Sequence, residues 1–203
     1  MAADFSKAFF RQGELGAELT RKGIHVLIAF VPSLAAIDRS LTALLLMSGI
    51  LFYAWAESMR FLGFSLPLIS RITGVVSRKR EQGHFVLGPV TLGLGALLPL
   101  LIFPRPVAAI AIYALAFGDG ISSLVGKFLG RLRPAFLAGK SIEGSFACFT
   151  ATFLAGFMVF REWETALAVG LVSVVADALP LRDFDNLVLP LAAGFTALIL
   201  QVL

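Results

Sequence analysis

The sequence predicts an all-α integral membrane protein with about seven transmembrane helices. Hydrophobic residues make up 58% of the 203-residue chain and charged residues only 15%, and the mean hydropathy is +0.90. This apolar share exceeds that of an ordinary soluble domain. Apolar segments also recur along the whole length, so we expect one polytopic membrane domain over residues 1–203.

The chain opens with a polar lead, residues 1–22, in which phenylalanines stand beside lysine and arginine. Such a mixture favours a segment that lies along the membrane interface. Seven apolar segments follow, at about 24–37, 41–57, 85–103, 106–117, 142–160, 164–180 and 186–203. Several are shorter than the roughly 20 residues that span the hydrocarbon. Their helices must therefore extend into flanking polar residues or be broken.

The basic residues fall almost entirely on one side of this arrangement. When the loops alternate across the membrane, only Arg39, Arg105 and Arg161 of the 17 lysines and arginines lie on the opposite side. The positive-inside rule then places the N-terminus in the cytoplasm and, with seven spans, the C-terminus outside. The polar loops at 58–84 and 118–145 consequently face the cytoplasm, where nucleotides are found.

The most polar and glycine-rich stretch is 118–145, where an apolar segment stops at Gly118-Asp119-Gly120. Glycines allow backbone N–H groups to approach phosphate oxygens, basic side chains neutralise them, and an aspartate can hold the magnesium that polyphosphates carry. The stretch therefore predicts a cytoplasmic nucleotide-binding loop. Its candidate binding residues are Gly118, Ser122, Ser123, Gly126, Gly130, Lys140, Ser141, Glu143 and Gly144.

Structural roles stay open for several of these residues. Asp119 could cap a helix or pair with a lysine, and Lys140 with Glu143 could form a helix start that Ser141 caps. The Gly-Lys-Ser sequence at 139–141 is not a Walker loop, because the upstream glycine at the required spacing is missing and no strand precedes it. A single cysteine, Cys148, excludes an intramolecular disulfide and a cysteine-based metal cluster.

A second acidic group lies at the inner ends of the last two apolar segments. It contains Asp177 and Asp185, and Asn186 follows as a candidate nucleotide-binding residue. Carboxylates that meet at a phosphate-binding loop are what magnesium-assisted phosphoryl transfer requires. We therefore expect Asp119, Asp177 and Asp185 to hold Mg²⁺, although helix capping alone would also account for Asp185.

The end of the N-terminal lead supplies the remaining candidates. Arg21 lies one helical turn before His25, and Lys22 lies three residues before it, so the three side chains share a helix face. A histidine in an apolar segment is most often only a satisfied polar residue, and phosphate binding or catalysis are the alternatives. The groups that could accept a proton from a substrate hydroxyl are His25, Glu81, Glu143, Asp177 and Asp185.

Five short motifs follow one another along the chain: Glu18-x-x-Arg21-Lys22-x-x-His25, Arg80-Glu81-x-Gly83, Gly118-Asp119-Gly120-x-Ser122-x-x-x-Gly126-x-x-x-Gly130, Lys140-Ser141-x-Glu143-Gly144-Ser145 and Asp185-Asn186-x-x-x-Pro190. In this order they resemble the polyprenol kinase family, which groups dolichol kinase, phytol kinase and the CTP-dependent diacylglycerol kinase. The family is more distantly similar to phosphatidate cytidylyltransferase. The resemblance implies a magnesium- and CTP-dependent lipid kinase whose essential positions include Arg21, Lys22, Asp119 and Gly126. The chain has Gly120 where members often have alanine, and Asp177 where glutamate is more usual.

We therefore expect an enzyme that transfers the γ-phosphoryl group of CTP, or of another nucleoside triphosphate, to the hydroxyl of a polyprenol, a phytol-like isoprenoid alcohol or diacylglycerol. Its expected catalytic residues are Arg21, Lys22, His25, Asp119 and Lys140. The alternatives are a cytidylyltransferase acting on a lipid phosphate and, in another class, an ion-coupled transporter or scaffold. No nucleic-acid partner is expected, and the expected location is the bacterial inner membrane with the site on the cytoplasmic face.

Overall fold

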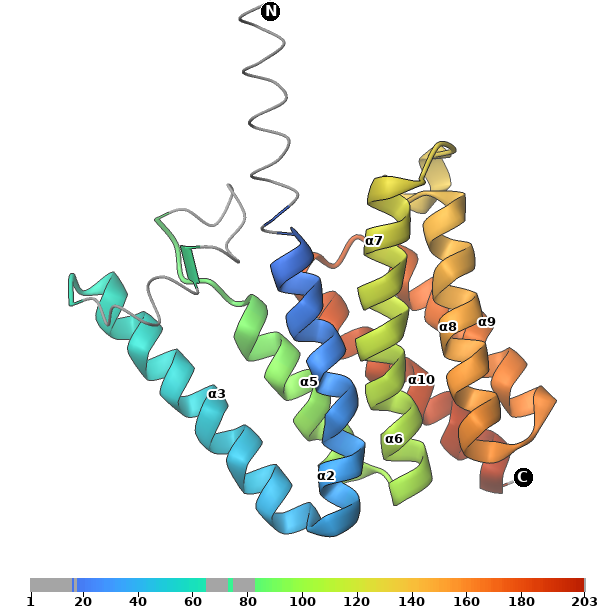
Figure 1. Ribbon diagram of the computed structural model, residues 1–203, viewed down its shortest axis with the longest axis horizontal. Helices are drawn as coiled ribbons and strands as arrows, with labels where there is room; N and C mark the ends of the chain where they lie inside the picture. The colour runs from blue at the N-terminus through green and yellow to red at the C-terminus, as the bar shows by residue number, and fades with distance from the viewer. Residues whose placement is uncertain (1–15, 17, 65–72, 75–82, 203) are drawn as a thin grey trace, which may run out of the picture.

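The computed structural model describes residues 16, 18–64, 73–74 and 83–202, and every regular element in these ranges is helical (Figure 1). The predicted all-α fold is confirmed. Five helices are long and apolar enough to cross a membrane: Glu18–Ile37, Arg39–Phe61, Arg105–Phe128, Ile142–Phe160 and Arg182–Val202. Two shorter helices, α5 (Gly88–Ile102) and α9 (Trp163–Ala178), account for the remaining predicted segments. The number of true spans stays a prediction.

The elements follow the chain in a simple order. The first helix, Glu18–Ile37, includes the 3₁₀ turn η1 (Ile28–Phe30) and α2 (Val31–Ile37). The elements after it are α3 (Arg39–Phe61), α5, α6 (Arg105–Tyr113), the π-helical turn η3 (Ala114–Asp119), α7 (Gly120–Phe128), η4 (Ala135–Leu137), α8 (Ile142–Phe160), α9, η5 (Arg182–Phe184) and α10 (Asp185–Val202). Several helices extend into flanking polar residues, as expected because the apolar segments alone are shorter than a membrane span.

The helices run alternately up and down, so their connections gather at the two ends of the bundle (Figure 1). The start of the first helix, the α7–α8 connection and the α9–α10 turn lie at one end, which we call the loop end. The turns between α2 and α3, α5 and α6, and α8 and α9 lie at the other end, together with the C-terminus. The first helix thus starts at the opposite end from the C-terminus, as an odd number of crossings requires.

The continuous helix Arg105–Phe128, formed by α6, η3 and α7, is the centre of the bundle. In its most apolar stretch 67% of the residues are buried, against 17% to 33% in the other four long helices. Ile110, Ile112 and Leu115 on this helix are completely buried. Large apolar residues on the outer helices stay exposed instead, as on the lipid-facing surface of a membrane bundle. A polar residue in the buried middle of this helix, such as Asp119, is therefore removed from bulk water and lipid.

The predicted helix end at Gly118 is wrong. The central helix continues through Gly118 and Asp119 to Phe128, so the irregular connection covers 129–141 and is shorter than the predicted loop at 118–145. The physical reason is packing. A Cβ added to Gly118 would lie 2.8 Å from Cγ2 of Thr152, and one added to Gly126 would lie 3.1 Å from Oγ of Ser141. These glycines let α8 approach the central helix closely, as small residues do between membrane helices.

Two predicted features lie outside the described residues. The interfacial lead at 1–22 is described only from its last turns, where residues 18–22 are helical. Arg80 and Glu81 belong to a stretch that is not described, so the motif that they form before α5 is known structurally only from Gly83 onward.

The arrangement of helices supports a direct test of topology. Fusions of a compartment-sensitive reporter at Ala3 and at Leu203 should report opposite sides of the membrane, with the N-terminal reporter in the cytoplasm, because basic residues gather at the loop end. Two reporters on the same side would contradict both the number of crossings and the shared cytoplasmic face.

Candidate active site

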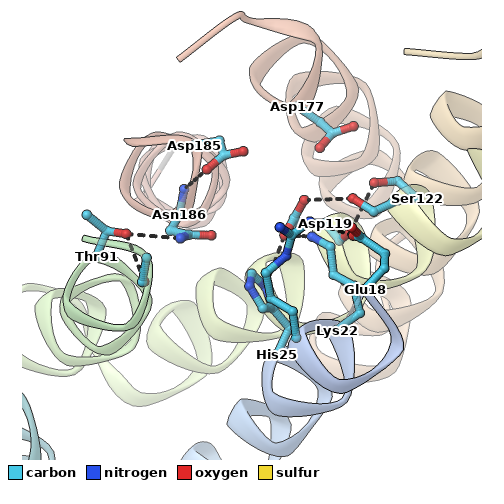
Figure 2. Close-up of polar contacts among 12 residues, drawn as sticks. Glu18, Lys22, His25, Thr91, Asp119, Ser122, Asp177, Asp185 and Asn186 are labelled. Atoms are coloured by element: carbon cyan, nitrogen blue, oxygen red, sulfur yellow. Dashed lines mark hydrogen bonds and ion pairs between the residues drawn. The ribbon is translucent and has the colours of Figure 1, made fainter. Parts of the chain in front are cut away.

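A buried ion pair joins the first helix to the centre of the bundle. Nζ of Lys22 lies 2.5 Å from Oδ2 of Asp119, and Nδ1 of His25 lies 3.0 Å from the same oxygen (Figure 2). All three side chains are at most 6% exposed. Burying an unpaired charge costs several kcal/mol, so these groups require one another at this depth. Three residues that sequence analysis proposed separately thus form one cluster.

The backbone around Asp119 explains how the first helix reaches it. Asp119 is the last residue of the π-helical turn η3, and such turns occur frequently at functional sites. The next residue, Gly120, faces the first helix: a Cβ there would meet Val26 at 3.7 Å and His25 at 3.9 Å. The small residue therefore allows the first helix to pack directly against the turn that carries the carboxylate.

The neighbouring serines also contact Asp119. Oγ of Ser123 donates to Oδ1 of Asp119 at 3.3 Å, and Oγ of Ser122 donates to its backbone oxygen at 3.2 Å. Arg21 pairs with Glu18 at 2.5 Å, and Nζ of Lys127 lies 3.7 Å from the other oxygen of Glu18. At the loop end, Arg21 and Lys127 therefore both pair with Glu18, close to the cluster.

A second ion pair, which is only partly buried, lies beside the first. Lys140, just before α8, pairs with Asp177 at the end of α9. Burial alone would lower the pKa of Lys140, but the carboxylates of Asp177 and Asp119 outweigh that effect and raise the pKa. Lys140 is therefore protonated at neutral pH, and its charge acts on both acidic residues.

Asp185 and Asn186 stand at the start of α10. Oδ1 of Asp185 accepts from the backbone N–H of the next residue, Asn186, at 2.8 Å. A capping side chain accepts from an N–H two or three residues further on, so helix capping by Asp185 stays a prediction. Nδ2 of Asn186 donates to Oγ1 of Thr91 on α5 at 3.0 Å. Sequence analysis did not select Thr91, because nothing in the chain order indicates that α5 lies against α10. Nucleotide binding by Asn186 stays a prediction.

The acidic residues form a loose group rather than a closed metal cage. In the described part of the chain, no three His, Cys, Asp or Glu side chains are close enough together to hold a metal ion. Asp119, Asp177 and Asp185 nevertheless come within electrostatic range of one another from three elements (Figure 2). Magnesium that arrives with a polyphosphate keeps several waters and needs only one or two carboxylates. The donor set thus fits a magnesium–nucleotide complex, and metal binding stays a prediction.

A polar pocket of about 270 Å³ opens next to Asp119. Its lining residues are Glu18, Ser122, Ser123, Gly126, Lys127, Arg133, Gly139, Lys140, Ser141 and Gly144. Most residues predicted to bind a nucleotide therefore meet in one place. Four residues predicted to bind a nucleotide are not part of the lining: Gly118, Gly130, Glu143 and Asn186. Sequence analysis did not select Lys127 and Arg133, although their positive charge within the polar stretch was a usable signal.

Hydrogen bonds hold the connection between α7 and α8 in place at this pocket. Arg133 donates to the backbone oxygens of Gly126 at 2.5 Å and Gly139 at 2.7 Å. Oε1 of Glu143 accepts from the backbone N–H groups of Arg131 and Leu132. Ser141 caps α8 by accepting from Gly144, as predicted. Glu143 and Ser141 therefore have structural roles, and the positive N-terminal end of α8 lies at the pocket.

Comparison with curated proteins finds relatives among plant phytol kinases. The chain is 27% identical to a probable chloroplastic phytol kinase of Triticum aestivum, over 90% of this chain and 67% of the relative, and 28% identical to one of Zea mays, over 90% and 66%. It is also 33% identical to the CTP-dependent diacylglycerol kinase 1 of Eremothecium gossypii, over 40% of this chain and 26% of the relative. No family model and no solved structure matches the chain.

The chain thus spans about two thirds of the length of the phytol kinases that it matches. Those relatives are chloroplast proteins, so the comparisons give no support to the expected bacterial inner membrane. The resemblance itself extends over 90% of this chain. The chain is therefore a relative of the phytol kinases and of the CTP-dependent diacylglycerol kinase, and its resemblance to the polyprenol kinase family is confirmed.

Proposed function

We propose that this chain is a lipid kinase that transfers the γ-phosphoryl group of CTP, with Mg²⁺, to the hydroxyl of a membrane lipid alcohol such as phytol. One observation carries the proposal: a polar pocket with three basic side chains opens directly beside the buried Lys22–Asp119 pair. The names of the relatives support the reaction type, and the diacylglycerol kinase supports CTP as the donor.

The pocket suits the phosphate groups of a nucleotide. Lys127, Arg133 and Lys140 line it and supply positive charge, and the N-terminal end of α8 adds its helix dipole. Lys140 is held by Asp177, so its ammonium group has a fixed place before any ligand binds. Fixed charges do not have to reorganise during the reaction, which is the main source of electrostatic catalysis.

The Lys22–Asp119–His25 cluster suits the transfer step. Phosphoryl transfer passes through a loose transition state, so positioning and charge stabilisation contribute more than proton removal. Lys22 places a positive charge beside the pocket, and Nε2 of His25 would accept or orient the hydroxyl proton, because Nδ1 already faces the Asp119 carboxylate. Asp119, with Asp177 or Asp185, would hold the Mg²⁺ of the nucleotide complex, and that ion would neutralise phosphate oxygens.

The function is tested with purified protein in lipid nanodiscs, CTP labelled in the γ-phosphate, Mg²⁺ and a panel of phytol, farnesol and diacylglycerol. The proposal expects label in the lipid fraction and CDP as the other product. A parallel reaction with a lipid phosphate in place of the alcohol tests the cytidylyltransferase alternative, which pyrophosphate release would identify. Unchanged CTP with every alcohol would overturn the proposal.

Asp119→Asn should lower turnover by at least about 10²-fold, the effect of removing one preorganised charged group from a transition state. The matched control is Asp38→Asn, because Asp38 caps α3 at the far end of the bundle and asparagine caps equally well. Turnover and thermal unfolding are measured for both variants. Activity of Asp119→Asn within about tenfold of wild type, or about 1.4 kcal/mol, would remove Asp119 from the mechanism.

Lys140→Ala should raise the apparent KM for CTP about tenfold or more while leaving the KM for the alcohol nearly unchanged, because a charge–phosphate contact is lost. The change also leaves Asp177 unpaired, so the double variant Lys140→Ala/Asp177→Asn serves as the control. Recovery of CTP affinity in the double variant would show that Lys140 only neutralises Asp177.

His25→Ala should lower turnover by about 10²-fold or less, because proton removal by a base accelerates phosphoryl transfer only slightly when the transition state is loose. Rates are compared with those of Asp119→Asn at saturating CTP and alcohol. If both variants fold and lose activity equally, His25 is an essential catalytic group and this assignment is wrong.

A further inference from the structure

The contact between Thr91 and Asn186 joins two helices that are far apart in the sequence. Thr91 on α5 is 3% exposed and Asn186 on α10 is 6% exposed. Nδ2 of Asn186 donates to Oγ1 of Thr91 at 3.0 Å (Figure 2). The hydrogen bond is buried, so it is protected from competition by water.

The chemistry of the threonine hydroxyl fixes which end of the amide faces it. A hydroxyl has one proton, and that of Thr91 is directed to backbone oxygens of its own helix, 3.0 Å from Gly88 and 3.3 Å from Leu87. Thr91 can then only accept a hydrogen bond from Asn186. The NH₂ group of the amide must face Thr91, and the amide oxygen points to the side on which Asp119 and Asp185 lie (Figure 2).

Close packing holds the backbone of Asn186 in the same place. A Cβ added to Gly95, one helical turn after Thr91, would lie 2.0 Å from the backbone oxygen of Asn186. α5 and α10 therefore touch through their backbones at this point. The contact constrains Asn186 at its main chain, and Thr91 constrains it at its side chain.

In the described part of the chain, the hydrogen bonds of Asn186 with other side chains run from its backbone N–H to Asp185 and from Nδ2 to Thr91, so neither of them engages the amide oxygen. Asp119 lies on the side to which the amide oxygen points, and Asp185 is the preceding residue (Figure 2); neither carboxylate can donate a hydrogen bond while ionised. An uncharged amide oxygen beside carboxylates is an oxygen donor of the kind that hard cations such as Mg²⁺ accept as a ligand.

We propose that Thr91 is a positioning residue that turns the amide of Asn186 so that its oxygen, rather than its NH₂ group, faces the magnesium of the bound nucleotide complex. The inference rests on the proposed function. The opposite orientation would direct two N–H groups at the cation and repel it. Thr91 contributes no ligand of its own and acts only through Asn186.

The test measures binding of Mn²⁺, as a paramagnetic substitute for Mg²⁺, in the presence of CTP by the loss of the free-ion EPR signal relative to a protein-free sample with the same Mn²⁺ and CTP, and it requires no turnover. Thr91→Val keeps the shape and removes the hydroxyl, and it should weaken Mn²⁺ binding about tenfold or more, as loss of a supporting contact does at metal sites. Thr91→Ser should restore the wild-type affinity. The matched control is Thr196→Val, because Thr196 on α10 bonds only within its own helix.

Two results would overturn the inference: Mn²⁺ binding by Thr91→Val equal to that of the wild type, or weak binding that Thr91→Ser does not restore. A further variant keeps the test valid if Thr91→Val is unstable. Asn186→Ala should weaken Mn²⁺ binding, and adding Thr91→Ala to it should change nothing more, because Thr91 acts through Asn186 alone. Failure of the proposed function has a different signature, in which the wild type binds Mn²⁺ with CTP but phosphorylates no alcohol.

Discussion

The buried pair of Lys22 and Asp119 is the interaction on which the rest of the site depends. It brings the first helix of the bundle to the central helix, at a π-helical turn beside which Gly120 leaves room for the first helix. Neither charge is stable alone at this depth, because the desolvation of one ion is offset only by the other. The pair also sets the position of His25, which approaches the same carboxylate oxygen.

A second pair, Lys140 with Asp177, repeats this arrangement across the polar pocket. Each pair joins a lysine to an aspartate, so the site can meet phosphate oxygens with lysine and a cation with carboxylate. Such a site contains several charged groups, but its net charge is close to zero before a ligand binds. This explains how a bundle with an apolar surface can hold many ionisable groups at its loop end without losing stability.

Much of the fold and part of the site could be predicted from the sequence. The seven apolar segments became helices, Ser141 caps α8 as expected, and Ser122, Ser123, Gly126 and Lys140 share one pocket. The continuation of the helix through Gly118 could not be predicted, because glycine serves both to end helices and to let helices pack closely. Which lysine pairs with which aspartate, and the contact of Asn186 with Thr91, depend on how distant helices lie together. No local pattern encodes that arrangement.

The central claim is that Lys22 and Asp119 act as one unit at the transfer step. Turnover at saturating CTP and alcohol is measured for Lys22→Met, for Asp119→Asn and for the double variant, each shown to be folded. Residues that act as a unit have strongly non-additive effects, so the account predicts that the double variant is about as slow as the slower single variant. Losses that multiply in the double variant, or wild-type turnover in Lys22→Met, would contradict it.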